Sequence, residues 1–115
     1  MTFSIVLVAI GGALGGIFRY AIANKFDETI YPFGTFIVNV VGSLILGIVL
    51  FSSASDQIVF LIGVGFCGAF TTFSSFSYQT LELWEAGRDG AVFVHAIGTI
   101  VMAFAGFSLA WLLVA

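Results

Sequence analysis

The chain has 115 residues, of which 61% are hydrophobic and only 8% are charged. A soluble domain carries about 25% charged residues, so three Lys or Arg and six Asp or Glu are too few to coat a soluble fold of this length. A nucleic-acid-binding protein is excluded as well, because it needs a basic patch and the chain has only three Lys or Arg. We therefore expect a protein surrounded mostly by lipid.

Four apolar segments are long enough to cross a bilayer, since each crossing helix needs about 20 apolar residues. We predict an all-α membrane protein with spans at about 3–23, 33–51, 58–84 and 91–115, forming a single transmembrane domain over residues 1–115. Four helices can hardly enclose a pathway alone, which favours an oligomer.

The first segment is rich in glycine. Gly12 and Gly16 have the GxxxG spacing, which lets two helix backbones approach closely in lipid. In the second segment, Thr35 and Asn39 are four residues apart and share one helix face, which Ser43 continues. A polar side chain in the membrane is costly unless it is hydrogen-bonded. Asn39 therefore either holds two helices together or donates its amide N–H groups to a passing anion.

The third segment is unusual in its middle, where small and hydroxyl residues gather at membrane depth: Gly63, Gly65, Gly68 and the Thr-Thr-Phe-Ser-Ser run at 71–75. Irregular backbone in a membrane is tolerated only where protein or a water cavity satisfies its polar groups. The composition suits a helix that breaks near its middle, with free carbonyls for a cation and helix N-termini facing an anion. It also suits a continuous helix whose small residues pack against a neighbour.

Two further pairs of residues have helical spacing. Phe73 and Phe76 share one face, and the positive edge of a phenyl ring can meet an anion, although phenylalanines usually face lipid or the core. His95 and Thr99 share a face of the fourth segment. His95 either bonds a partner near the interface or lines a pore, and no second His or Cys stands nearby at the spacing of a metal site.

Acidic residues are absent from the depth of every predicted span, whereas proton-coupled transporters generally need a titratable group there. No phosphate loop or nucleophile with its base is present, so an enzyme is not expected. Four spans place both termini on one side, and all three basic residues, Arg19, Lys25 and Arg88, fall on the other. The positive-inside rule then predicts that both termini lie outside.

Three motifs resemble those of the Fluc family of fluoride channels, also called CrcB proteins. They are GGALGGIFRY at 11–20, GTFIVNVVGS at 34–43 and GFCGAFTTFSSFS at 65–77, and the third is the most specific. The resemblance covers nearly the whole chain. It implies a fluoride-selective channel for passive export across the cell inner (plasma) membrane, which relieves fluoride toxicity. It also implies an antiparallel, dual-topology-type dimer with two pores.

The resemblance assigns roles to individual residues. It implies a structural sodium ion, not transported, at the dimer centre, bound by the backbone carbonyls of Gly68 and Thr71 from both subunits. Phe73 and Phe76 match the phenyl rings of the fluoride path, and Asn39 matches the pore asparagine.

A second group of residues matches less fully. Thr35 lies where the family has a pore-side threonine, and Arg19 matches an arginine near a vestibule. Ser74, His95 and Thr99 are further candidates for the pore or vestibule, but the polar row of the fourth span ends early in this chain.

Alternatives remain for the partner and for the function. A homodimer is the default, while the one-sided basic residues favour a fixed orientation and thus a heterodimer with a homologue. A small multidrug exporter also has four helices, but its coupling glutamate is missing from this first span. A non-transporting membrane subunit would show no ion flux.

Overall fold

The computed structural model describes residues 2–25 and 32–114. These residues form four helical spans long and apolar enough to cross a membrane, and each begins and ends within two residues of its predicted bounds. The spans are α1 (Thr2–Lys25), α2 (Phe33–Phe51), an interrupted third span over Asp56–Glu85, and α6 (Asp89–Val114). The prediction of an all-α protein with four spans is therefore confirmed.

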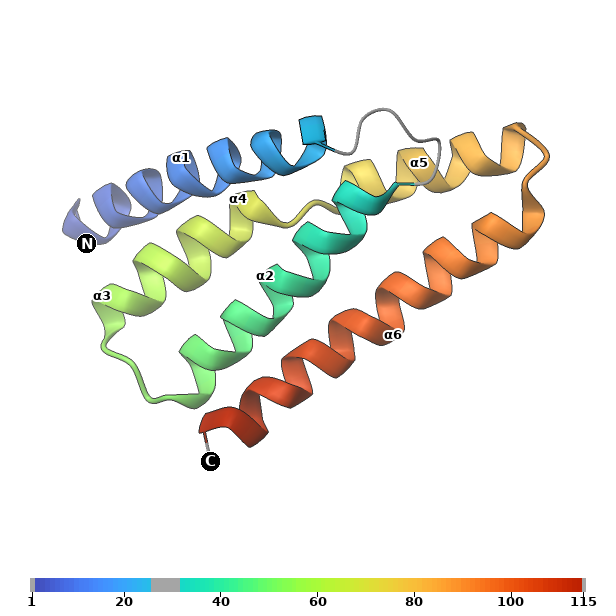
Figure 1. Ribbon diagram of the computed structural model, residues 1–115. Helices are drawn as coiled ribbons and strands as arrows, with labels where there is room; N and C mark the ends of the chain where they lie inside the picture. Colours follow the sequence, from blue (N-terminus) through green and yellow to red (C-terminus); the bar gives the residue numbers. More distant parts are fainter. Residues whose placement is uncertain (1, 26–31, 115) are drawn as a thin grey trace.

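The third span is interrupted as the composition predicted. Its helical pieces are α3 (Asp56–Ile58), the π-helix η1 (Val59–Cys67), α4 (Gly68–Phe70) and α5 (Phe73–Glu85). Between α4 and α5 the backbone becomes extended, with ψ 155° at Thr71 and φ −148°, ψ 117° at Thr72. This two-residue break is visible in Figure 1 as the coil that joins α4 to α5.

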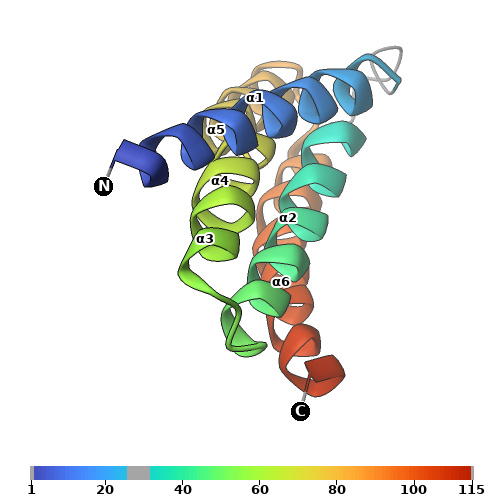
Figure 2. The ribbon, with the colours of Figure 1, turned by 90° about the vertical axis from the view of Figure 1, so that its left-hand side faces the viewer.

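Successive spans run in opposite directions, which brings the two termini to the same end of the molecule. In Figure 1 both termini and the α2–α3 connection lie towards the left, and the α5–α6 connection lies at the right. Figure 2 shows that α1 lies across the third span, steeply inclined to α2 and α6, which run side by side. The α5–α6 turn is closed by Gly87 at φ 74°, where Gly87 N–H donates to the Trp84 carbonyl and Arg88 N–H to the Leu83 carbonyl. This pairing is the Schellman arrangement that ends a helix sharply.

Glycines let α1 and η1 touch backbone to backbone. A Cβ at Gly11 would lie 1.9 Å from the Leu61 carbonyl oxygen, and one at Gly15 would lie 2.2 Å from that of Phe66. The predicted GxxxG pair, Gly12 and Gly16, is not the pair that makes this contact within the protomer. Gly12 is in only ordinary contact, and a Cβ at Gly16 would meet no described atom within 4 Å. The close-approach pair is Gly11 and Gly15, which has the same spacing one position earlier.

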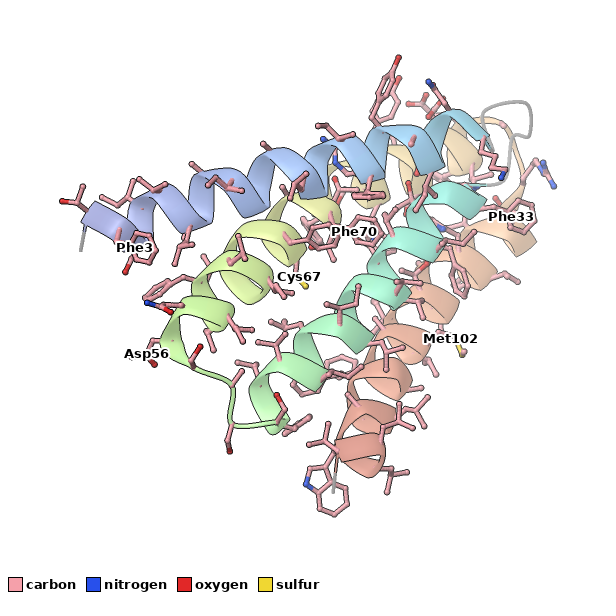
Figure 3. All side chains as sticks on the ribbon, turned by 60° about the vertical axis from the view of Figure 1, so that its left-hand side comes forward. Phe3, Phe33, Asp56, Cys67, Phe70 and Met102 are labelled. Atoms are coloured by element: carbon pink, nitrogen blue, oxygen red, sulfur yellow. The ribbon has the colours of Figure 1, made fainter. Side chains whose placement is uncertain are left out.

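The core of the described protomer is small. Its buried apolar side chains are Val38, Val49, Cys67, Phe70, Leu83 and Ala110. Figure 3 shows many side chains pointing outward, with Met102 on the outer side of α6, whereas Cys67 and Phe70 lie among the helices. Large apolar residues cover the outside of all four spans, and Trp84 and Trp111 are exposed at the far ends of α5 and α6. A surface of this kind suits lipid, which makes this a multi-pass membrane protein.

Candidate functional site

The Asn39 side chain holds the break from α2. Its Nδ2 donates to the Thr72 carbonyl at 3.2 Å, and its Oδ1 accepts from the Thr72 N–H at 2.8 Å. The amide thereby satisfies both polar groups of one extended residue, as a neighbouring strand would. Asn39 therefore holds α2 against the third span, which is one of the two roles expected for it. An amide NH₂ carries two donors, so the contact with Thr72 uses only one of them.

The side chain of Thr72 begins α5. Its Oγ1 accepts a hydrogen bond from the Ser75 N–H at 3.2 Å, which makes Thr72 the N-cap of the helix. The Ser74 hydroxyl lies 3.2 Å from the same oxygen. Thr71 instead bonds back to the end of η1, donating from both N–H (3.0 Å) and Oγ1 (2.8 Å) to the Cys67 carbonyl. Neighbouring threonines thus end one helix and start the next.

A cavity of about 490 Å³ opens beside the break, between α2, the third span and α6. It is lined by Asn39, Gly42, Ser43, Leu46, Gly63, Val64, Cys67, Gly68, Thr71, Thr72, Phe73, Phe76, Thr99, Ile100, Ala103 and Phe104. None of these lining residues carries a charge. The cavity brings together most of the candidate residues predicted from the sequence, namely Asn39, Gly68, Thr71, Phe73, Phe76 and Thr99.

Aromatic rings form one wall of this cavity. The ring centroids of Phe73 and Phe76 are 5.9 Å apart, at an interplanar angle of 32°. Phe76 also lies 5.0 Å from the His95 ring, centroid to centroid. Phe76 is thus packed between two neighbours, whereas Phe73 is 79% exposed. Phenyl edges carry partial positive charge, so a ring edge turned towards the cavity would suit an anion better than a cation.

The Thr99 hydroxyl is the cavity's other notable polar group. Thr99 is buried, with 4% of its surface exposed, and its Oγ1 has no hydrogen-bond partner among the described residues. A buried hydroxyl without a partner costs free energy. His95, one turn earlier on α6, is fully buried and contacts Phe76 without lining the cavity.

Three other predicted residues lie outside the lining of the cavity. The Thr35 hydroxyl donates to Oε1 of Gln79, which joins α2 to α5. Ser74 is exposed and stays near the N-cap of α5. Arg19 reaches from α1 to the Ala69 carbonyl, with Nε donating at 3.0 Å. Arg19 therefore borders the break from the side of α1, and its predicted place in a vestibule stays a prediction.

Comparison with known proteins identifies the family. The family model described as "CrcB-like protein, Camphor Resistance (CrcB)" matches residues 6–111. The chain belongs to the CrcB family.

Its relatives in that family share most of its length. A protein of Halobacterium salinarum, named fluoride-specific ion channel FluC 1, is 47% identical over 110 residues, which cover 96% of this chain and 92% of that protein. FluC 2 of Haloarcula marismortui is 43% identical, covering 91% of this chain and 88% of its own. FluC of Leptospira interrogans is 39% identical, covering 90% of this chain and 91% of that protein. These relatives are named as ion channels and not as enzymes, in agreement with the sequence-based prediction.

Sequence reasoning missed two residues of the site. Thr72 had been considered only as part of a hydroxyl-rich run, although a Thr three residues before Ser75 has the spacing of an N-cap. Gln79, the partner of Thr35, carries no comparable local signal, since 44 residues separate the two.

Proposed function

We propose that this CrcB-family chain forms a fluoride-selective channel that exports fluoride passively across the cell inner membrane and so relieves fluoride toxicity. The observation that carries the proposal is the uncharged cavity, lined by the Phe73–Phe76 pair and by residues that carry hydrogen-bond donors. The choice of fluoride as the ion follows from the names of the relatives.

The chemistry of the cavity agrees with a small anion as its occupant. The second N–H of the Asn39 amide and the Thr99 hydroxyl are donors on lining residues. Fluoride is small and strongly hydrated, so it needs such donors in place of its water shell. The absence of carboxylates from the lining removes the groups that would repel it. In this proposal Phe73, Phe76, Asn39 and Thr99 form the path, and Thr35 positions α5 through Gln79.

A second subunit completes the channel in this proposal. The protomer leaves Phe73 uncovered, with 79% of its surface exposed, and the cavity beside it is open to one side. An antiparallel partner of the same kind would cover this ring and supply a second, symmetric path. A homodimer is the simplest form, and a heterodimer with a homologue is the alternative.

A structural sodium ion fits the break at the centre of such a dimer. Gly68 is exposed, and a Cβ there would meet no described atom within 4 Å. Thr71 is extended, so its carbonyl departs from the helical direction. Hard cations prefer oxygen ligands, including backbone carbonyls. Gly68 and Thr71 from two subunits would hold the ion, whose charge offsets the partial negative charge of the converging carbonyls.

Fluoride efflux from liposomes tests the proposed function. Vesicles that contain the purified protein are expected to release fluoride much faster than empty vesicles, while chloride release matches that of empty vesicles. Efflux that equals that of empty vesicles, from protein shown to be dimeric, would contradict the homodimeric channel. Co-reconstitution with a homologue from the same cell would then separate a heterodimer from a non-transporting subunit.

Reporter fusions distinguish the two kinds of dimer. A C-terminal reporter that is active on one side of the membrane only should give signal on both sides if antiparallel homodimers form. Signal from one side alone would show a fixed orientation and would exclude the antiparallel homodimer.

A further inference from the structure

We propose that the side chains of Asn39 and Thr72 are positioning residues that hold two backbone carbonyls of the break, those of Gly68 and Thr71, out of helical hydrogen bonds. They thereby set the affinity of these carbonyls for a cation. The inference rests on the sodium site of the proposed function, and it assigns to two side chains a role in shaping ligands that they do not themselves provide.

The first carbonyl is that of Gly68. In a continuous α-helix each N–H donates to the carbonyl four residues earlier, so Thr72 would donate to Gly68. The Thr72 N–H instead donates to Asn39 Oδ1 at 2.8 Å. The Asn39 side chain therefore takes the donor that Gly68 would otherwise receive.

The second carbonyl, that of Thr71, loses its donor in the same way. Ser75 N–H would donate to it in a continuous helix, but it donates to Thr72 Oγ1 at 3.2 Å. The N-cap of α5 therefore removes the helical partner of Thr71, just as Asn39 removes that of Gly68. Two side-chain oxygens thus replace two main-chain acceptors.

Two neighbouring carbonyls accept hydrogen bonds from side chains. Arg19 Nε donates to the Ala69 carbonyl at 3.0 Å, and Asn39 Nδ2 donates to that of Thr72 at 3.2 Å. Side chains thus bond carbonyls 69 and 72, whereas 68 and 71, like that of Phe70 at the end of α4, lose their helical donors. The carbonyls of Gly68 and Thr71 are three residues apart and are those that the proposed function assigns to sodium.

A released carbonyl binds a cation without first breaking a hydrogen bond. If the diverted N–H groups returned to the carbonyls, sodium would have to compete with them. A hydrogen bond of ordinary net strength then predicts that about fivefold to tenfold more sodium is needed for each carbonyl recaptured.

The test measures how the thermal unfolding midpoint of the detergent-solubilised protein depends on sodium, with potassium as the replacement at constant ionic strength. A ligand that binds only the folded protein raises this midpoint as its concentration rises. Thr72→Val removes the cap and returns Ser75 N–H to the Thr71 carbonyl. This variant should therefore need about fivefold to tenfold more sodium for the same rise in the unfolding midpoint. Thr72→Ser keeps the cap oxygen and should stay within about twofold of wild type.

Thr80→Val is a matched control on the same helix. The Thr80 hydroxyl donates to the Phe76 carbonyl at 2.7 Å, away from the break. The control removes a threonine hydroxyl from within α5, away from its N-cap, and should leave the sodium midpoint, the sodium concentration that gives half of the stabilisation, unchanged. An equal shift in Thr80→Val and Thr72→Val would overturn the proposal, because the shift would then reflect general destabilisation of α5.

A rescue variant separates release of the carbonyl from loss of the cap. Ser75→Pro removes the competing N–H, and proline is tolerated in the first turn of a helix. The double variant Thr72→Val with Ser75→Pro should return to the wild-type sodium midpoint, although it also lacks the cap. Ser75→Pro alone should match wild type as well, which keeps the proposal testable if Thr72→Val does not fold. Failure of the rescue in a folded double variant, or a weakened sodium response in folded Ser75→Pro, would overturn it.

Wild-type protein separates this inference from the sodium site itself. If wild-type stability does not respond to sodium over potassium, the proposed sodium site fails. If wild type responds and Thr72→Val responds identically, the sodium site stands and the positioning role is wrong. Asn39→Ala should raise the sodium requirement by a similar factor through Gly68, measured by stability and not by flux, because Asn39 also lines the cavity.

Discussion

Arg19 Nε donates a hydrogen bond to the Ala69 carbonyl oxygen, linking residues 50 positions apart in the sequence. The contact joins α1 to α4 immediately before the break of the third span. It places a guanidinium group beside a run of backbone carbonyls, where the positive charge strengthens the hydrogen bond. The arginine therefore anchors a helix that supplies no residue to the described cavity lining.

We predict that Arg19→Gln destabilises the protomer. Hydrogen bonds to charged groups contribute about 1.5–3 kcal/mol, and the loss should appear in denaturant-induced unfolding followed by tryptophan fluorescence. Arg19→Lys keeps the charge but lacks the planar guanidinium, so its stability should fall between those of the other two. Wild-type stability in Arg19→Gln would show that the contact with Ala69 contributes nothing.

Gly15→Ala should separate α1 from η1. The added Cβ would lie 2.2 Å from the Phe66 carbonyl oxygen, which is backbone and cannot rotate away. Overpacking of this kind costs about 1–3 kcal/mol, and the midpoint of thermal unfolding should fall accordingly. Gly16→Ala is the control, since no described atom lies within 4 Å of its Cβ. Equal destabilisation by the two substitutions would contradict the register of the α1–η1 contact.

Gly68→Val should impair the dimer while sparing the protomer fold. A Cβ at Gly68 meets no described atom within 4 Å, so any crowding would come from the partner subunit or the sodium ion. Size-exclusion chromatography in detergent should show more monomer, with unchanged helical circular dichroism. Gly98→Val on α6, where a Cβ also meets no described atom, is the matched control. A stable Gly68→Val dimer with wild-type sodium dependence would remove Gly68 from the ion site.

Phe76→Ile should reduce fluoride efflux about fivefold, since the lost aromatic contact is worth about 1 kcal/mol. Isoleucine keeps apolar bulk but has no positive ring edge to offer an anion. The dimer should survive, as judged by size exclusion. Phe93→Ile, on an exposed face of α6, should conduct as wild type does. Unchanged efflux in Phe76→Ile would take this ring out of the fluoride path.

Local patterns in the sequence predicted the spans and the break. The length of an apolar run and the residues that flank it predict where a span begins and ends. The run at Phe33–Phe51 is bounded by Pro32 and by polar residues, and the bounds of α2 agree with the prediction. The glycines and hydroxyl residues before Phe73 likewise mark where a helix would end and restart. The composition left a continuous helix open, and the extended backbone at Thr71 and Thr72 excludes it.

Packing register could not be predicted from local pattern. Gly11–Gly15 and Gly12–Gly16 have identical spacing and differ only by a rotation of about 100° around the helix. Which pair faces η1 depends on where η1 packs, and the spacing of residues within α1 carries no information about that position. The same holds for Asn39, whose partner Thr72 is 33 residues away. Helical spacing showed the face on which Asn39 lies, while the backbone atoms opposite that face follow from the tertiary fold.

The cavity draws its described lining from α2, the third span and α6, and none of it from α1. Substitutions on the outer face of α1 therefore leave the described lining of the cavity unchanged. The outward residues of α1, such as Ile5, Leu14 and Ile17, are free to follow the bilayer thickness and lipid composition of each host. A change of lipid environment can thus be met by substitutions in the first helix while residues 39–104 keep the lining of the cavity.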